Sequence, residues 1–245
     1  MPPSELRKDA REALAGKWGK AVCIILVYIA FSFVIGFIQG LVGEGSPLYT
    51  IIDLAFAIIS IPLSFGLIIS FMKLSRGEAV SVLDFLKEGF ARFGKSWGIA
   101  LHTLLRMLLP IACIILVALL LVFSIGFGVA SGNYILTAVI VALYIATIIY
   151  SVSIGLLYSL SYYIGYDNPE LSSKECVVQS AKLMKGNRGN LFLLELSFIG
   201  WAILAVFTLG IGMLWLMPYM QVALVCFYEK VIGKNTVEDA VKTEE

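Results

Sequence analysis

Long apolar runs separated by short polar segments dominate the chain. Six runs have the roughly 20 mostly apolar residues that a helix needs to cross a bilayer. They cover residues 20–42, 49–72, 98–124, 134–164, 191–209 and 212–229. Only a short turn separates the last two runs, and Gly210 and Gly212 permit a tight reversal there. The pattern predicts an all-α fold, a polytopic membrane helical bundle with six transmembrane helices.

The composition agrees with a membrane location. Hydrophobic residues make up 60% of the 245 positions and charged residues 14%, whereas soluble domains are about 45–50% apolar and about 25% charged. The lipid bilayer is therefore the expected surrounding of the chain. The net charge of +1 gives no electrostatic reason to expect nucleic acid as a partner.

Lys and Arg residues indicate which ends of the spans face the cytoplasm. All but one of the 18 lie before or at the start of the first run, after the second and fourth runs, and after the sixth. The connections 43–48, 125–133 and 210–211 contain none. Because cytoplasmic loops carry the excess of Lys and Arg, we predict that both termini lie in the cytoplasm.

Three of the basic segments share an amphipathic helical pattern. Residues 4–21, 81–100 and 172–192 each begin with a serine, a residue that favours the N-cap of a helix. Each then continues with apolar side chains on one side of the helix and charges on the other. Ser81 with Asp84 and Ser172 with Glu175 also have the spacing of a capping box. We predict three cytoplasmic amphipathic helices at the membrane interface.

The same segments divide the chain into units of similar plan. Each unit contains a surface helix, an outward span and a return span, over about residues 1–75, 76–168 and 169–235. Gly-Lys-Trp-Gly in the first unit and Gly-Lys-Ser-Trp-Gly in the second favour duplication, although any protein of helical hairpins needs capped, basic connections. We predict a pseudo-threefold parallel repeat of hairpins in a single membrane domain, 1–235, and a polar cytoplasmic tail, 236–245.

Ionisable residues within the apolar runs form a candidate intramembrane polar site, because charge is costly in lipid. They are Asp53, His102, Arg106 and Glu195. Arg106 and Glu195 both enter from the cytoplasmic side and are placed to pair across a polar cavity; alternatively, Arg106 extends to the headgroups. His102, one turn before Arg106, suits a proton relay or a structural hydrogen bond. Asp53 suits ion binding or exposure at the outer interface.

A stripe of hydroxyl groups follows one side of the fourth run. It contains Tyr144, Thr147, Ser151, Tyr158 and Tyr162. Such a stripe can line a pathway through the membrane. Alternatively, it packs tightly against another helix, with its hydroxyls bonded across the interface.

The chain carries no recognisable metal, cofactor or catalytic motif. His102 is the only histidine, which excludes a multi-histidine metal site within one chain, and the four cysteines are far apart. No nucleotide-binding, nucleophile-elbow or zinc-protease motif occurs. We therefore expect no cofactor, no metal and no catalytic residue.

Three segments give the chain a family resemblance. They are "RGEAVSVLDFLKEGFARFGK", "YDNPELSSKECVVQSAKLMKGN" and "LFLLELSFIGWAILAVFTLGIGMLWLMPYMQVALVCFYEK". With the N-terminal "SELRKDAREALAGKWGKA", they resemble the domain-of-unknown-function 975 family of integral membrane proteins, which occurs mostly in Gram-positive bacteria. The resemblance implies a multi-pass protein of the bacterial cytoplasmic membrane. It implies no activity and no catalytic residues.

The sequence favours a non-enzymatic protein, either a transporter-like bundle or an accessory membrane subunit. The alternative is a lipid-binding or lipid-modifying protein that acts at the cytoplasmic headgroup level, since the basic helices favour anionic headgroups. A second alternative is a structural membrane element. Another membrane protein or a second copy of the chain are further candidate partners.

The topology predicts the outcome of cysteine labelling in intact cells. A membrane-impermeant maleimide should label Ser46→Cys and Ser131→Cys from outside, because both lie in non-basic connections. Ser173→Cys should react only after the membrane is permeabilised. Labelling of Ser173→Cys from outside would overturn the predicted orientation.

Overall fold

The computed structural model describes the backbone of residues 1–131 and 134–244 and the side chains of residues 1–128 and 134–233. The described residues form helices and no strand, which confirms the all-α prediction. The helices are α1 (Pro3–Leu14), α2 (Trp18–Val42), α3 (Pro47–Ser75), α4 (Asp84–Ala91), α5 (Phe93–Ser131), α6 (Ile135–Leu157), α7 (Ser161–Asp167), α8 (Ser173–Leu183), α9 (Arg188–Leu196), α10 (Ile199–Phe207) and α11 (Met213–Glu244).

Five helical stretches are long and apolar enough to cross a membrane, among the residues that the structure describes. They correspond to the first five predicted spans and cover Trp18–Val42, Pro47–Ser75, Phe93–Gly128, Ile135–Asp167 and Arg188–Phe207. The sixth predicted span, 212–229, forms the first part of α11 and is not among the five. Its apolar run contains Pro218 and Gln221 and ends at Glu229. The six-span count therefore stays a prediction.

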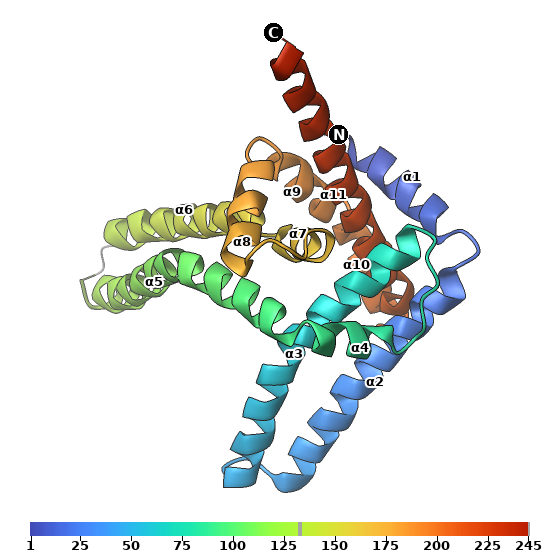
Figure 1. Ribbon diagram of the computed structural model, residues 1–245. Helices are drawn as coiled ribbons and strands as arrows, with labels where there is room; N and C mark the ends of the chain where they lie inside the picture. The colour runs from blue at the N-terminus through green and yellow to red at the C-terminus, as the bar shows by residue number, and fades with distance from the viewer. Residues whose placement is uncertain (132–133, 245) are drawn as a thin grey trace.

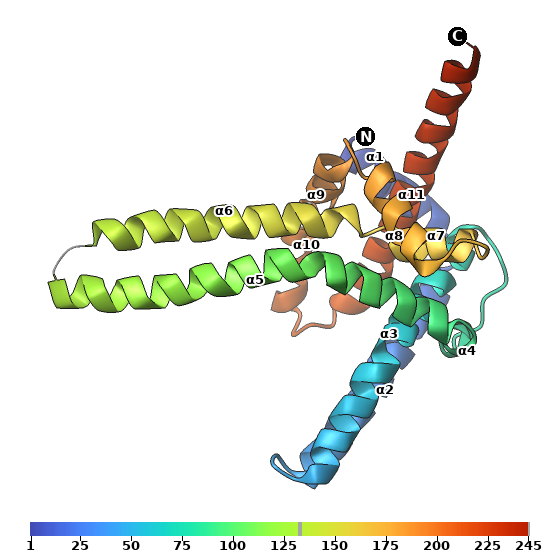
Figure 2. The same ribbon diagram turned by 60° about the vertical axis from the view of Figure 1, so that its left-hand side comes forward.

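Two long hairpins project from a common core. The α2–α3 and α5–α6 hairpins leave this core in different directions (Figures 1 and 2). The core contains side chains from many elements, among them Leu6 of α1, Phe85 of α4, Val177 of α8 and Phe227 of α11, all fully buried. The outer halves of the hairpins expose large apolar side chains, as at Phe33, which is 72% exposed. Surfaces of this kind are suited to contact with lipid.

Helix α1 packs its apolar residues against the rest of the protein. Leu6, Ala10 and Leu14 lie on that face and are fully buried. The helix packs mainly against α11. Its burial is a hydrophobic interaction within the chain, and the predicted position of these helices at the membrane interface stays a prediction.

The predicted serine caps are right for one of the three segments. Ser172 accepts a hydrogen bond from the backbone N–H of Glu175, whose side chain accepts one from the Ser172 N–H, a complete capping box. The other two predictions are wrong in detail. Helix α1 begins at Pro3, before Ser4, and α4 begins at Asp84, two residues later than a Ser81 cap requires. Proline is well suited to the start of α1, because it has no backbone N–H that would lack a hydrogen-bond acceptor there.

Two glycines allow α3 and α4 to touch through their backbones. A Cβ atom on Gly66 would overlap the carbonyl oxygen of Phe85, and one on Gly89 would overlap that of Pro62. Such an approach is open only to residues without a side chain. It places α4 across the middle of α3, where the α2–α3 hairpin meets the core.

A proline in α3 supplies a second contact at this crossing. Pro62 has no N–H, so the carbonyl of Ile58, four residues earlier, lacks its helical donor. The indole Nε1 of Trp97 in α5 donates to this oxygen at 3.1 Å. The break in the helical hydrogen bonding of α3 thereby becomes a link between the two long hairpins.

Gly66→Ala should lower the free energy of unfolding by about 1–3 kcal/mol, because the added methyl group forces α3 and α4 apart. The measurement is thermal unfolding of the purified protein in detergent micelles. Gly36→Ala is the matched control, since a Cβ there meets nothing within 4 Å. Equal stability of the two variants would show that the crossing is not tightly packed.

Candidate functional site

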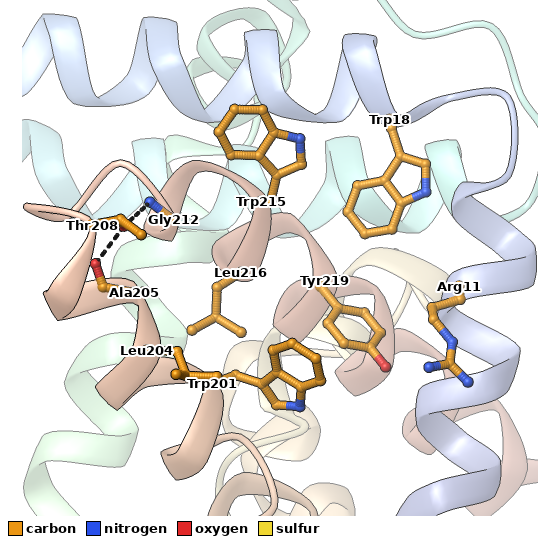
Figure 3. A pocket seen from close by; sticks show the side chains of 10 residues that line it. All are labelled: Arg11, Trp18, Trp201, Leu204, Ala205, Thr208, Gly212, Trp215, Leu216 and Tyr219. Carbon is orange, nitrogen blue, oxygen red and sulfur yellow. Dashed lines mark hydrogen bonds between the residues drawn. The ribbon is translucent and has the colours of Figure 1, made fainter.

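A groove lies between α1, the start of α2 and the α10–α11 hairpin (Figure 3). Its volume is about 380 Å³. Most of its lining is aromatic or aliphatic, and we call it the tryptophan groove. The lining residues are Arg11, Trp18, Trp201, Leu204, Ala205, Thr208, Gly212, Trp215, Leu216 and Tyr219.

The groove has a closed floor and open walls. Leu216 and Ala205 are buried at 6% and 4% exposure. Trp201 and Trp215 are about half exposed, at 52% and 49%. The tryptophan side chains are therefore available to a bound molecule, whereas the floor belongs to the protein core.

The polar groups of the groove gather beside α1. Figure 3 shows Arg11 and the hydroxyl group of Tyr219 on the same side. The Tyr219 hydroxyl donates to the backbone carbonyl of Arg7 at 3.1 Å. Arg11 is exposed, and its guanidinium has no carboxylate partner in the described part of the chain. The groove thus presents one unpaired positive charge at its edge.

Helix α1 is fixed beside the groove by charged contacts with α11. Lys230 Nζ lies 2.9 Å from Glu5 Oε1 and 2.6 Å from Asp9 Oδ2. At the other side of α1, Arg7 donates to the carbonyl of Ser197 at 3.3 Å, at the break between α9 and α10. These contacts hold α1 against the third hairpin.

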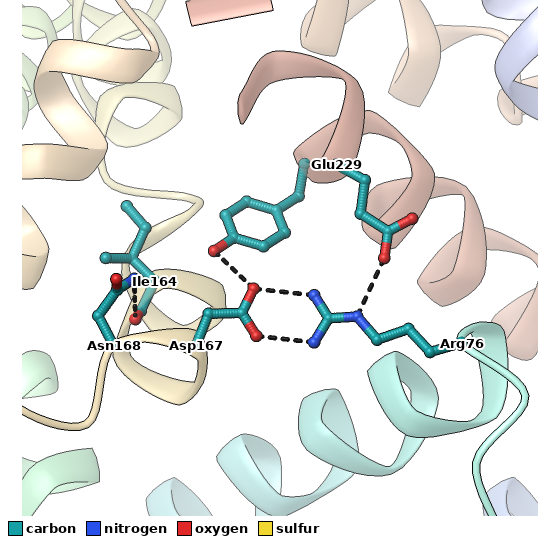
Figure 4. Close-up of polar contacts among 6 residues, drawn as sticks. Arg76, Ile164, Asp167, Asn168 and Glu229 are labelled. Atoms are coloured by element: carbon teal, nitrogen blue, oxygen red, sulfur yellow. Dashed lines mark hydrogen bonds and ion pairs between the residues drawn. The ribbon is translucent and has the colours of Figure 1, made fainter. Parts of the chain in front are cut away.

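A cluster around Arg76 joins three parts of the chain (Figure 4). Arg76 follows α3 directly, Asp167 ends α7, and Tyr228 and Glu229 lie in α11. The guanidinium donates to both oxygens of Asp167, at 2.7 and 2.8 Å, and through Nε to Glu229 at 3.1 Å. The Tyr228 hydroxyl donates a hydrogen bond to Asp167 Oδ2 at 3.0 Å. We call these four residues the Arg76 cluster.

The Arg76 cluster has the properties of a structural joint. Its hydrogen bonds with Asp167 raise the pKa of Arg76 further above the ordinary value, against the opposing effect of burial, so the guanidinium stays charged. Bidentate pairing of this kind fixes orientation as well as distance. The carboxylates of Asp167 and Glu229 both accept hydrogen bonds from the guanidinium. Neither is therefore well placed to act as a general base.

A second ion-pair group holds α4 to α3. Glu88 lies 2.5 Å from Lys73 Nζ and also accepts a hydrogen bond from Arg92. The guanidinium of Arg92 stacks over the ring of Tyr166 in α7, 5.3 Å from its centroid. Burial alone would raise the pKa of Glu88, but the hydrogen bonds from Lys73 and Arg92 outweigh it and lower the pKa.

The structure does not bring the four predicted intramembrane residues together. Arg106 stacks over the Tyr158 ring at 5.6 Å, and its buried Nη1 has no hydrogen-bond partner in the described structure. Glu195 is exposed on α9, and no ion pair joins it to Arg106 among the described side chains. His102 Nδ1 lies 2.8 Å from the carbonyl oxygen of Gly98, one turn earlier.

The fourth predicted residue lies at the far end of the first hairpin. Asp53 accepts a hydrogen bond from Gln39 across the α2–α3 hairpin at 3.2 Å, and both side chains are exposed. This contact links the two helices of the α2–α3 hairpin near its turn. An intramembrane polar site formed by the four residues stays a prediction.

Two of the five hydroxyl groups in the predicted stripe bond to their own helix. Thr147 and Ser151 each donate to the carbonyl four residues earlier, at 2.8 Å. Tyr158 lies under the Arg106 guanidinium, Tyr162 contacts the ring of Phe65 in α3, and Tyr144 is half-buried. Hydrogen bonds to the residue i−4 carbonyl satisfy the hydroxyls without a second helix.

Sequence reasoning missed both the tryptophan groove and the Arg76 cluster. Trp201, Trp215 and Tyr219 lie in the last hairpin, and tryptophan and tyrosine are enriched where membrane proteins meet the lipid–water boundary. That composition was the one available signal for the groove. Arg76 and Asp167 each border a predicted connection, where charges are ordinary and carry no signal of pairing.

Arg76→Ala should lower the free energy of unfolding by about 1–3 kcal/mol, because it leaves Asp167 and Glu229 without their cation. The free energy of unfolding of Arg76→Lys should lie between those of the wild type and Arg76→Ala, because an ammonium group keeps the charge but cannot make the bidentate contact. The measurement is the melting temperature in detergent micelles. Lys8→Ala, which removes an exposed pair with Glu12, is the control and should change little. A melting temperature for Arg76→Ala equal to that of the control would contradict the joint.

Glu88 should make stability depend on pH. Because its pKa is lower in the folded protein than the ordinary 4.5, its stabilisation is complete above that value and is lost as the pH falls through the folded pKa. The difference in melting temperature between wild type and Glu88→Gln should therefore shrink below pH 4.5. A difference that stays constant across that range would show that Glu88 is not held as a charged partner.

Comparison with known proteins gives a family and no function. No curated protein and no solved structure matches the chain. One family model covers residues 1–235, nearly the whole sequence and every hairpin described above. The match includes α1, the Arg76 cluster and the tryptophan groove, and the chain accordingly belongs to the family described as "Protein of unknown function (DUF975)".

Proposed function

We propose that this protein is a non-enzymatic, lipid-binding integral membrane protein. The tryptophan groove carries the proposal. Indole rings prefer the boundary between lipid and water, where an apolar body and a polar N–H are both accommodated. Three of the residues that line the groove are tryptophans, and two of these are half exposed. A molecule with an apolar chain fits such walls.

The lining favours binding over catalysis. Arg11 is the one charged residue among the residues that line the groove, which include no carboxylate, histidine or cysteine. Those three side chains supply most general acids, general bases and nucleophiles in enzymes. The planar guanidinium of Arg11 suits recognition of an anion.

The proposed topology has six spans, with both termini on the cytoplasmic side of a bacterial membrane. It is supported by the distribution of Lys and Arg and by α11, which returns from the turn at Gly210 beside α10. The predicted threefold repeat is supported by the Arg76 cluster. In that cluster, residues at the ends of the three return spans meet at one place.

A transporter-like bundle is the second candidate function. The α2–α3 and α5–α6 hairpins are joined at the core and diverge beyond it (Figure 2). Helices that are fixed at one end and separate at the other are able to change their mutual angle with little loss of packing. A change in the angle between the two hairpins is compatible with lipid binding.

Trp201→Ala should weaken the binding of phospholipid about fivefold or more, because truncating a central aromatic side chain costs at least about 1 kcal/mol in most binding sites. Native mass spectrometry of the detergent-purified protein, titrated with phosphatidylcholine, measures the bound fraction. Phe207→Ala is the matched control, since Phe207 is an exposed aromatic residue on the same helix and lies outside the groove. Equal affinities of the two variants would refute the proposed function.

A further inference from the structure

We infer that the tryptophan groove selects an anionic phospholipid, with the phosphate against Arg11 and one acyl chain along the indole rings. This inference rests on the proposed lipid-binding function and names its ligand class. It commits to a lipid drawn from the membrane. One end of the groove carries the charge of Arg11, and at the other end the Thr208 hydroxyl is already hydrogen-bonded within the protein.

Arg11 has no partner of its own in the described structure, unlike three other basic residues of the same segment, Arg7, Lys8 and Lys17. Arg7 donates to the carbonyl of Ser197, Lys8 pairs with Glu12, and Lys17 donates to the carbonyl of Leu74 at 2.9 Å. In the described structure, no carboxylate or carbonyl oxygen accepts a hydrogen bond from Arg11. A free guanidinium beside an apolar groove has the charge and the planar donor geometry that match a phosphate.

The hydroxyl group at the far end of the groove is already hydrogen-bonded within the protein. The Thr208 hydroxyl donates to the Ala205 carbonyl at 2.7 Å and accepts from the Gly212 N–H at 2.8 Å (Figure 3). The turn between α10 and α11 thereby satisfies its own hydrogen bonds. Apart from the indole N–H of Trp215, the remaining surface at this end is apolar, and the only charge of the lining is Arg11. An amphiphile is therefore favoured in one direction, with its head at α1 and its chain toward the turn.

The size of the groove limits how much of a lipid enters it. A volume of about 380 Å³ is near the lower end of the range of about 300–1,000 Å³ that is usual for ligand pockets. That space suits one acyl chain, and the second chain would remain in the bilayer. The half-exposed positions of Trp201 and Trp215 leave the groove open for this arrangement.

The proposed topology gives the bound lipid a leaflet. With α1 on the cytoplasmic side and the turn at Thr208–Gly212 toward the outside, a lipid with its head at Arg11 has the orientation of the inner leaflet. Anionic lipids at the cytoplasmic surface attract basic side chains by about 1 kcal/mol for each charge. The charge of Arg11 and the direction of the groove therefore favour the same ligand.

Brominated lipids test the selectivity with the intact protein. Bromine quenches tryptophan fluorescence, and three of the four tryptophans of the chain line the groove. The purified protein in micelles is titrated with dibrominated phosphatidylglycerol or dibrominated phosphatidylcholine. Wild type should bind the anionic lipid about fivefold more tightly. Arg11→Gln should lose this preference, and Arg11→Lys should keep most of it.

Lys8→Ala controls for diffuse surface charge, because it removes the same charge from the same helix outside the groove. The preference should survive in this variant. An equal loss of preference in Lys8→Ala and Arg11→Gln, or a wild-type protein that binds both lipids equally, would overturn the inference. Arg11 and Lys8 are both exposed, so neither substitution disturbs the core.

The experiment separates the inference from the proposed function. If Trp201→Ala weakens both lipids while wild type shows no preference, lipid binding stands and its anionic selectivity is wrong. If Trp201→Ala weakens neither lipid, the proposed function fails, and the inference fails with it. If Trp201→Ala weakens both lipids and Arg11→Gln affects only the anionic one, both proposals are supported.

Discussion

The bidentate contact between Arg76 and Asp167 is the interaction on which the arrangement of the helices most depends. The contact joins the end of α3 to the end of α7. The Nε of Arg76 also donates to Glu229 of α11. Apolar helices in lipid gain little from hydrophobic association, because the lipid tails are as apolar as the side chains. A fixed polar contact at the helix ends therefore sets a relative position that apolar packing alone leaves loosely defined.

The core lies at one end of the two long hairpins. The short helices α1, α4 and α8 bury their apolar residues in it, and the crossing at Gly66 and Gly89 brings the backbones of α3 and α4 together. Beyond the core, the α2–α3 and α5–α6 hairpins expose apolar side chains along their outer halves. Helix contacts within the protein are thus concentrated in the core, and the hairpins leave their apolar surfaces free for lipid.

The sequence predicted the elements that depend on local pattern. Apolar run length predicted five spans that the structure supports, and the spacing of Ser172 and Glu175 predicted a capping box that is present. It did not predict the Arg76 cluster, because its principal pair is separated by 91 positions and neither residue has a distinctive neighbourhood. It also missed Arg11 as a site residue, since the groove exists only when α1, α10 and α11 come together.

Helix α11 shows why the last apolar segment differs from the other five. Its first turns supply Trp215 and Tyr219 to the groove, its middle is buried, and its later turns carry Glu229 and Lys230. Glu229 belongs to the Arg76 cluster, and Lys230 holds α1 through Glu5 and Asp9. The polar residues of this segment lower its mean hydropathy. The same helix contributes to the Arg76 cluster, to the attachment of α1 and to the aromatic lining of the tryptophan groove, so the geometry of the groove depends on the same contacts that fix the helix ends.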